Sequence, residues 1–239
     1  MNSNILPYLC SNIGEFYDER EYLSNITFPK LKETLDKINI NFDPIQIDWD
    51  EDDEYVRSGH LLRLLLHNIQ HSAPFFLCLL GQQYGHYFEK RESSVEALMN
   101  ESSLREMSWI EKNLLVASQT GYNYLINPIT YHNSFLEFQI NAALFEEKNY
   151  PFYRFYYRQI EYLDEKFMHF PIEERKKALR AYEPENNYCE FKIKDLKMKI
   201  AKKGLIVKYY SSLEQLGDFV YEDIMEMMQS KVAPFFLIN

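Results

Sequence analysis

The sequence predicts an α/β fold with a doubly wound, mainly parallel five-stranded sheet and helical insertions. The strongest observation is the run from Ala73 to Gly81, in which six consecutive apolar residues follow a proline and a glycine closes the run. A run this short and this continuously apolar favours a strand that is covered on both faces. Leucines at helical spacing precede the run and a helix-prone region follows it, so helices are available for both faces.

Four other segments are predicted to complete the sheet. The first strand runs from Ile5 to Ser11, and Ile45 and Ile47 alternate with polar neighbours as a second strand would. Aromatic residues at 152–157 and the segment 205–211 supply the fourth and fifth strands. If the spatial order is the common 2-1-3-4-5, ligands should bind outside the carboxyl ends of the first and third strands.

Helices are predicted between these strands from apolar residues that recur at steps of three and four. They cover about residues 13–38, 60–71, 134–147, 172–182, 190–203 and 212–229. Pro29 predicts a kink or a restart in the first helix. Glu15, Asp18 and Glu19 fit its first turns, where carboxylates interact well with the helix dipole and would repel a phosphate.

The length of 239 residues and the lack of a Pro/Gly/Ser-rich linker predict one domain over residues 1–239. Helical insertions are expected near residues 86–130 and 161–203. The sequence VAPFFLIN at its end is apolar, so we expect the chain to be the amino-terminal part of a larger multidomain protein. Self-association through this apolar end is a further possibility.

Charge and cysteine content exclude several classes of protein. The formal net charge of -10 argues against a general nucleic-acid surface or an anionic-membrane surface, because each needs clustered lysine and arginine. Three cysteines at wide spacing predict free thiols in a reducing compartment. No apolar run approaches the eighteen residues of a membrane span. These observations together predict a cytoplasmic location.

Candidate metal and phosphate sites have simpler structural explanations. The acidic run Asp48–Glu54 lacks the glycine and distal glutamate of a calcium loop and is predicted to be a solvated loop. His60, His67 and His71 have zinc-like spacing, but no third ligand type is nearby and HExxH is missing. The segment from Gly81 to Gly85 lacks the Lys-Ser/Thr of a Walker motif. No metal and no cofactor are therefore predicted.

Arginines interrupt the aromatic run of the predicted fourth strand. Arg154 and Arg158 alternate with tyrosines and phenylalanines, a mixture that could stack on nucleic-acid bases. Simple alternation along a strand is the simpler explanation of the pattern. We therefore assign the two arginines no binding role from the sequence.

Several motifs, taken in order, resemble a known family. They are SNIGEFYDEREYL at 11–23, FPKL at 28–31, FDPIQIDW at 42–49 and PFFLCLLGQQYG at 74–85. They resemble the TIR-like amino-terminal domain of the telomerase-associated vault protein, of nephrocystin and of related NACHT/WD-repeat and TPR proteins. The resemblance implies a TIR-like, flavodoxin-like form of the sheet and association with a STAND NTPase. Asn12 departs from the pattern by replacing a second serine, and Trp49 lacks the neighbouring arginine and glycine of the family.

Two functions are consistent with this pattern. The first is a non-catalytic protein–protein interaction or scaffolding module at the amino terminus of a larger signalling NTPase or repeat protein, whose partners are other proteins or downstream domains of the same chain. The second is a TIR-type NAD glycohydrolase, which would be the only reading that requires NAD. The loops at the strand ends and the resemblance together predict a ligand-binding cleft at Ser11, Asn12, Trp49, Gly81, Gln82 and Tyr84.

Glu137 distinguishes the two functions. By resemblance it would be the catalytic carboxylate of the glycohydrolase and would stabilise an oxocarbenium-like ribose. Glu137 also stands three residues after Ser134, where a capping box gives a glutamate a purely local role. Because no catalytic constellation exceeds such structural explanations, the sequence favours the interaction module over the enzyme.

Overall fold

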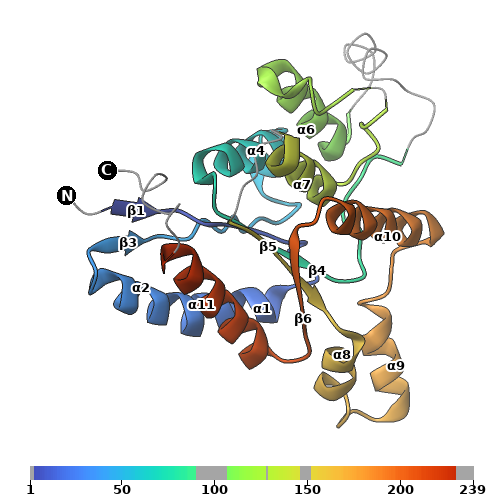
Figure 1. Cartoon of the computed structure of the whole chain (residues 1–239). Coiled ribbons are helices and arrows are strands. Elements are labelled where there is room, and N and C mark those ends of the chain that lie inside the picture. The colour runs from blue at the N-terminus through green and yellow to red at the C-terminus, as the bar shows by residue number, and fades with distance from the viewer. Residues whose placement is uncertain (1–2, 90–106, 128, 146–151, 230–239) are drawn as a thin grey trace. The chain divides into compact units, whose positions relative to one another are not determined.

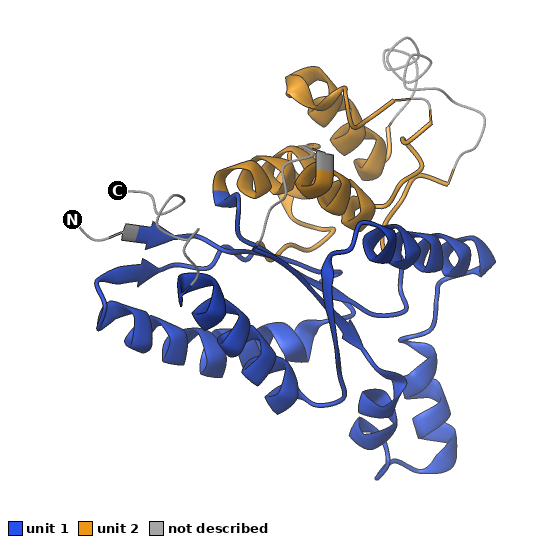
Figure 2. Cartoon of the chain, viewed as in Figure 1, with its two compact units in different colours: residues 1–46, 72–84, 148–239 blue, residues 47–71, 85–147 orange. Residues whose placement is uncertain are grey.

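The chain folds into two compact units, each with its own hydrophobic core. The computed structural model describes residues 3–89, 107–127, 129–145 and 152–229 (Figure 1). Unit 1 comprises residues 1–46, 72–84 and 148–239, and unit 2 comprises residues 47–71 and 85–147 (Figure 2). Unit 2 is therefore formed by two excursions of the chain out of unit 1. That residues 1–239 form a single domain stays a prediction.

Unit 1 contains two parallel sheets, of two and four strands, rather than one five-stranded sheet. In the smaller sheet β1 (Ser3–Ile5) pairs with β3 (Ile40–Phe42). The larger sheet has the order β2-β4-β5-β6 and consists of β2 (Tyr8–Cys10), β4 (Phe76–Leu80), β5 (Tyr153–Arg158) and β6 (Ile206–Tyr210). The last three strands lie where the sequence predicted them, and all pairings between them are parallel.

Prolines explain why the first two predicted strands were placed wrongly. Pro7 has no N–H to donate, and the predicted first strand is divided there into β1 and β2. The predicted second strand is reduced to a single bridging residue, Ile45, which follows Pro44. The Ile45 N–H donates to the Pro7 carbonyl at 2.8 Å, and the Leu9 N–H donates to the Ile45 carbonyl at 3.0 Å. The regular part of this second segment, β3, lies earlier than predicted.

Every helix predicted in unit 1 is present among the described residues, but the first is divided into three segments and one further helix is found. The first predicted helix consists of α1 (Tyr17–Tyr22), the π-helical segment η1 (Leu23–Thr27) and α2 (Phe28–Asp36). Pro29 lies in the first turn of α2, where a missing N–H is tolerated. The later helices are α8 (Ile160–Lys166), α9 (Ile172–Arg180), α10 (Asn187–Lys202) and α11 (Leu213–Gln229). Of these, α8 was not predicted.

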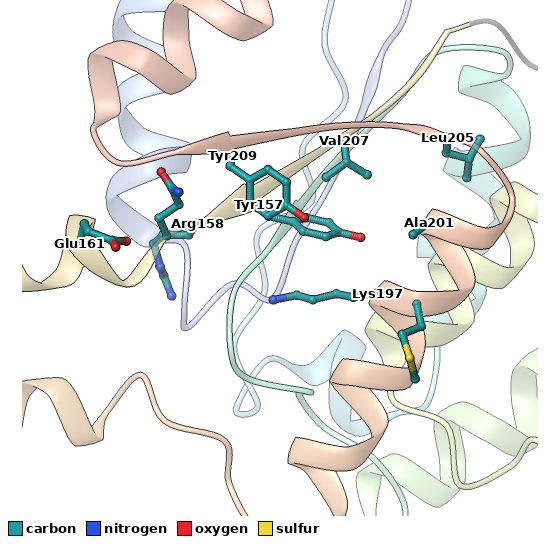
Figure 3. Close-up of a pocket in the computed structure, with 10 residues that line it drawn as sticks. Tyr157, Arg158, Glu161, Lys197, Ala201, Leu205, Val207 and Tyr209 are labelled. Carbon is teal, nitrogen blue, oxygen red and sulfur yellow. The ribbon is translucent and has the colours of Figure 1, made fainter.

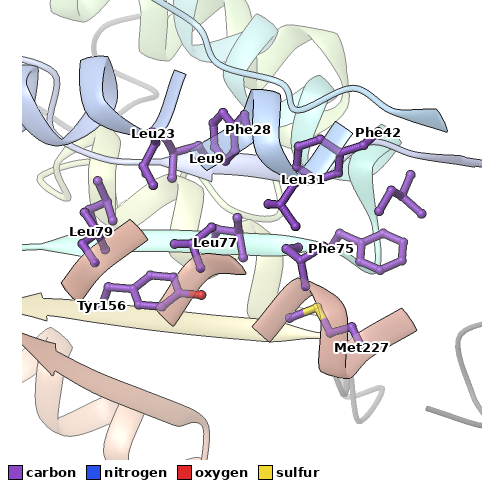
Figure 4. Packing of buried hydrophobic residues seen from close by; sticks show 14 of the residues in the cluster. Leu9, Leu23, Phe28, Leu31, Phe42, Phe75, Leu77, Leu79, Tyr156 and Met227 are labelled. Atoms are coloured by element: carbon purple, nitrogen blue, oxygen red, sulfur yellow. The ribbon is translucent and has the colours of Figure 1, made fainter. Parts of the chain in front are cut away.

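The core of unit 1 lies on one face of the larger sheet. Leu9, Leu77 and Leu79 point to this face and pack with side chains from η1, α2 and α11, among them Leu23, Leu31 and Met227 (Figure 4). Burial of each such side chain contributes about 1.5–3 kcal/mol. Because side chains alternate along a strand, their neighbours in sequence point to the opposite face. Helix α10 lies on that opposite face, beside β5 and β6.

Unit 2 is helical among its described residues. Its helices are α3 (Glu54–Arg57), α4 (Leu61–Ser72, whose last residue belongs to unit 1), α6 (Trp109–Ala117), the π-helical η2 (Ser118–Tyr122) and α7 (Phe135–Phe145). The buried amide of Asn113 joins three of them: it accepts from the Leu62 N–H at 3.0 Å and donates to the Val56 carbonyl at 2.8 Å. A capping box of Ser108 and Glu111 begins α6.

Other expectations concern single residues and termini. The three cysteines, Cys10, Cys78 and Cys189, are buried free thiols, as the sequence predicted. No helix in the described ranges is long and apolar enough to cross a membrane. Within the same ranges, no three His, Cys, Asp or Glu side chains gather as a metal site would require. The apolar sequence at the end of the chain, residues 232–239, lies outside the described residues.

Candidate functional site

The loops that follow β2 and β4 meet at the side chain of Glu15. Its Oε1 accepts a hydrogen bond from the Gln82 N–H at 2.8 Å, and its Oε2 accepts from the Gln83 N–H at 3.3 Å. Asn12 Nδ2 donates to the side-chain oxygen of Gln83 at 3.3 Å. Both loops leave the carboxyl ends of adjacent parallel strands, where binding sites of open α/β sheets are found.

Gly81 permits this close approach. A Cβ atom at this position would lie 1.9 Å from Glu15 Oε1, so any larger residue would collide with the carboxylate. The Gly81 carbonyl accepts a hydrogen bond from Lys197 Nζ at 2.6 Å, which brings α10 to the same place. The glycine is therefore required for packing against a charged group.

Arg158, at the end of β5, is the centre of a buried ion cluster. Its guanidinium donates to Glu15 Oε1 at 2.5 Å and to Glu19 Oε1 at 3.1 Å, and also to the Glu15 carbonyl at 2.9 Å. Tyr210, at the end of β6, donates its hydroxyl proton to Glu19 Oε1 at 3.0 Å. The side chains of Arg158 and Glu15 are completely buried. One arginine thus holds two carboxylates that would otherwise be unpaired in the interior.

Burial dominates the acid–base properties of this cluster. It raises the pKa of Glu15 to about 7, although Arg158 and the two loop N–H groups act in the opposite direction. Burial also lowers the pKa of Lys197, against the attraction of Glu15. The pKa of Arg158 is raised because the two carboxylates outweigh its burial. The charge of Glu15 therefore changes near neutral pH.

An open pocket of about 690 Å³ lies beside the cluster, between α10 and the ends of β5 and β6 (Figure 3). Its walls are the following residues: Tyr157, Arg158, Gln159, Glu161, Lys197, Met198, Ala201, Leu205, Val207 and Tyr209. The Tyr157 ring is 5.1 Å from Lys197 Nζ and makes an edge-to-face contact with Tyr209.

Two buried polar atoms of pocket residues have no hydrogen-bond partner among the residues that the structure describes. They are the hydroxyl of Tyr157 and Nε of Arg158. Tyr157 is only 5% exposed, and burial raises the pKa of its hydroxyl, which therefore stays protonated and can donate. An unsatisfied buried hydroxyl is unfavourable by about 1–3 kcal/mol. An acceptor atom supplied by a bound molecule would remove that penalty.

Five of the six residues of the predicted cleft lie in the loops that follow β2 and β4 in unit 1. They are Ser11, Asn12, Gly81, Gln82 and Tyr84. The Ser11 hydroxyl accepts from the Arg20 guanidinium at 3.1 Å, and the Tyr84 N–H donates to Glu185 at 3.1 Å. The ring of Tyr84 is fully buried. The sixth residue, Trp49, lies in unit 2, where it contacts the Trp109 ring. The described loops thus meet through internal contacts, and their function as a cleft stays a prediction.

Glu137 lies in the first turn of α7, in unit 2. Its N–H donates to the Ser134 hydroxyl at 3.2 Å, which is one half of the capping arrangement expected from the sequence. The residue is 2% exposed. Glu137 therefore takes part, through its backbone N–H, in capping the start of α7.

The residues that form the cluster were not predicted as a site. Glu15 and Glu19 were expected in the first turns of a helix, where they would interact with its dipole, but their side chains are buried in ion pairs with Arg158 at the end of β5. Asp18 alone behaves as expected of a surface carboxylate and pairs with Lys166. The available signal was an arginine within a strand of aromatic residues, since a buried guanidinium requires carboxylates.

Fold and site together define a parallel α/β protein with a buried ion cluster at the carboxyl ends of its strands. The chain is similar to tetratricopeptide repeat protein 41 of Rattus norvegicus, with 33% identity over 232 residues, which are 92% of this chain and 17% of that protein. The same protein of Mus musculus is 32% identical over 97% of this chain and 18% of its own length. The putative tetratricopeptide repeat protein 41 of Homo sapiens is 30% identical over 92% of this chain and 17% of its own length.

These relatives are much longer than this chain, which spans about one sixth of their length. No protein-family model and no solved structure matches the chain. The described part of the chain is built around parallel sheets, whereas a tetratricopeptide repeat is a pair of helices. The similarity therefore connects this α/β structure with one portion of a longer protein that is named for its repeats.

The comparisons correct the family resemblance drawn from the motifs. The chain was expected to resemble the TIR-like domain of the telomerase-associated vault protein, of nephrocystin and of related NACHT/WD-repeat and TPR proteins. The TIR-like assignment was wrong: the relatives found are named only for tetratricopeptide repeats. Short motifs such as LLG and Tyr-Gly after a buried strand are common consequences of an α/β fold, so they carried less information than their order suggested. In the part of the chain that the structure describes, the strands form sheets of two and four rather than the five-stranded TIR-like sheet.

Proposed function

We propose that this chain is a non-catalytic protein–protein interaction and scaffolding module of a larger repeat protein. The observation that carries the proposal is its similarity, over 92% of its length, to 17% of tetratricopeptide repeat protein 41. Tetratricopeptide arrays form extended concave surfaces that bind other proteins. A folded α/β module within such a protein would add a second binding surface to the repeats, or would bind the repeats themselves.

The buried cluster supports a structural role for the strand ends. A general acid or base must come within hydrogen-bond distance of its substrate. The side chains of Glu15 and Arg158 are completely buried, and each is occupied by the other and by the loops. They hold the loops in one conformation, as a binding surface that must keep its shape requires.

The proposal keeps the expected repeat-protein context but not the signalling NTPase or the NAD-cleaving enzyme. A repeat protein is the context that the relatives support, whereas no observation supports a signalling NTPase. The NAD-cleaving alternative depended on the resemblance that the comparisons contradict, and the contact between the Glu137 N–H and Ser134 is one that a helix start requires. We therefore retain the interaction module alone, with protein partners or other domains of the same protein as its ligands.

The proposal is tested by reconstituting a complex from purified components. Proteins near the chain in cells are first identified by fusing it to a biotin ligase, and each candidate is then purified and mixed with the chain. We expect at least one candidate, or a repeat domain of the same protein, to form a stoichiometric complex by calorimetry and light scattering. The proposal is contradicted if none binds directly while the chain converts a small molecule in the same preparation.

A further inference from the structure

Strand β6 has a free edge. Among the described residues it pairs with β5 only, and it ends the strand order of the larger sheet. The Tyr210 carbonyl accepts from Gln159 on the β5 side. Because backbone groups alternate in direction along a strand, the N–H and C=O groups of Val207 and Tyr209 point to the free edge. The side chains of Tyr209 and Ile206 are 57% and 46% exposed.

The sequence of β6 supplies little of the usual protection against pairing with another chain. Natural edge strands are commonly blocked by a lysine, a proline, a bulge or a covering helix. The sequence of β6, IVKYY, has one charged residue, Lys208. Its ammonium group is bound at 2.9 Å by Asp223, a buried residue of α11, so it is held on the core face of the sheet. No proline interrupts the strand.

The segment before β6 is basic although the whole chain is acidic. Residues 192–208 contain seven lysines and one aspartate, against a net charge of -10 for the chain. Lys202 and Lys203 are exposed and form no ion pair with any described residue. They precede β6 by only Gly204 and Leu205. Positive charge therefore stands free at the beginning of the open edge, where it would attract carboxylates.

The pocket adjoins the same edge. Val207 and Tyr209 of β6 form part of its wall, and the Tyr157 ring lies between β6 and Lys197 of α10 (Figure 3). In a strand added to a sheet edge, alternate side chains point to the same face and can enter a pocket there. The partnerless hydroxyl of Tyr157 would donate to an oxygen on such a side chain.

We propose that the free edge of β6 and this pocket together bind an extended acidic segment of a partner protein. The backbone of the segment pairs with Val207 and Tyr209, its carboxylates lie near Lys202 and Lys203, and one oxygen-bearing side chain reaches Tyr157. This inference rests on the proposed function, because it names the surface and the kind of partner through which the module acts.

The test begins with a library of random decapeptides displayed on phage and selected on the purified chain. We expect the enriched peptides to be acidic and to be lost when Val207→Pro replaces the wild type. This substitution removes an N–H that points to the free edge and that pairing with β5 does not use. The melting temperature of the variant shows whether its fold is intact. No enrichment, or enrichment that Val207→Pro leaves unchanged, overturns the proposal.

A second measurement leaves the protein unaltered. The most enriched peptide is synthesised with N-methyl groups on alternate residues, in the two possible phases. We expect one phase to lose binding at least about tenfold and the other to bind nearly as before, because only one set of N–H groups faces β6. Equal loss or equal binding in both phases contradicts strand addition, even where Val207→Pro fails to fold.

Charge and pocket contacts are tested on the same peptide. The double variant Lys202→Glu/Lys203→Glu should weaken binding at least about tenfold, whereas the matched control Lys32→Glu/Lys177→Glu, on exposed residues elsewhere, should change it less than about twofold. Tyr157→Phe should weaken it about threefold to tenfold. Equal effects of the two double variants, or no effect of Tyr157→Phe, overturn the corresponding contact and with it the proposed pose.

Other occupants give distinct results. Binding of a single-stranded oligonucleotide that depends on Lys202 and Lys203 would identify a nucleic-acid surface, and a dimer that Val207→Pro dissociates would identify a second copy of the chain. Either result contradicts the peptide proposal. A protein partner that binds wild type and Val207→Pro equally would leave the proposed function standing and refute this surface alone.

Discussion

Gly81 is the position at which the size of a single residue matters most in the candidate site. Gly81→Ala places a methyl group 1.9 Å from the Glu15 carboxylate, so the loop or the carboxylate must move. We expect the free energy of unfolding to fall by about 2–3 kcal/mol in urea titrations. Gly14→Ala is the control, because nothing lies within 4 Å of its added Cβ. Equal losses in the two variants would refute the packing argument.

Two adjacent tyrosines offer a test of the unsatisfied hydroxyl. Tyr157→Phe removes a buried O–H without a partner, so we expect the protein to gain up to about 1 kcal/mol of stability. Tyr156→Phe removes an O–H that donates to Asp223 at 2.9 Å and should cost about 1.5–3 kcal/mol. Chemical denaturation of both variants measures the change in the free energy of unfolding, which should rise for Tyr157→Phe and fall for Tyr156→Phe. A destabilised Tyr157→Phe would show that its hydroxyl is bonded in solution.

Single residues also show where prediction from sequence ends. The loops at Ser11 and Gly81 were found because strand ends define where loops gather in a parallel sheet. The pairing of Glu15 with Arg158 joins residues 143 positions apart. No local pattern contains a separation of that length, so the sequence analysis assigned Arg158 no role.

At the scale of elements, β4 is the strand on which the larger sheet depends. It pairs with β2 on one side and β5 on the other, and all five of its residues are buried. Leu79→Asp, or Phe76→Asp, should prevent folding, since an unpaired buried charge costs several kcal/mol against a total stability of about 5–15. Circular dichroism and solubility decide the outcome. Soluble variants that melt cooperatively would contradict the central position of β4.

Elements were predictable where burial is continuous and less so where prolines interrupt a segment. The apolar or aromatic runs of β4 and β5, and the inward-facing residues of α11, led to correct assignments. Pro7 and Pro44 shifted the paired residues of the first two strands by amounts that alternation could not reveal. The π-helical turn η1 before Pro29 has no signature in the apolar spacing, which continues through it.

For the whole molecule, the buried cluster predicts a pH dependence of stability. The pKa of Glu15 is raised by burial from its ordinary value of 4.5 to about 7, so the folded state holds this proton more tightly than the unfolded state. The resulting stabilisation is complete below about pH 4.5 and is lost as the pH rises through about 7. Relative to Glu15→Gln, the wild type should therefore lose about 3 kcal/mol between pH 4.5 and 8.

Urea titrations of both proteins at several pH values measure this difference directly. The Gln variant keeps most hydrogen bonds of the site but cannot ionise, so other titrating groups largely cancel in the comparison. A difference that is constant with pH would mean that Arg158 and the loop N–H groups cancel the effect of burial on the pKa of Glu15, and a difference that grows as the pH rises would mean that they outweigh it.

The division of unit 1 into three stretches of sequence has a consequence for synthesis on the ribosome. Strand β4 ends at Leu80, but its neighbour β5 begins only at Tyr153. At 5–20 residues per second, roughly 4–15 seconds pass before the second strand exists. During that interval the nascent chain presents an apolar strand with one side unpaired, which is the kind of segment that chaperones bind. Translation speed over residues 81–152 should therefore influence the yield of folded protein more than speed elsewhere.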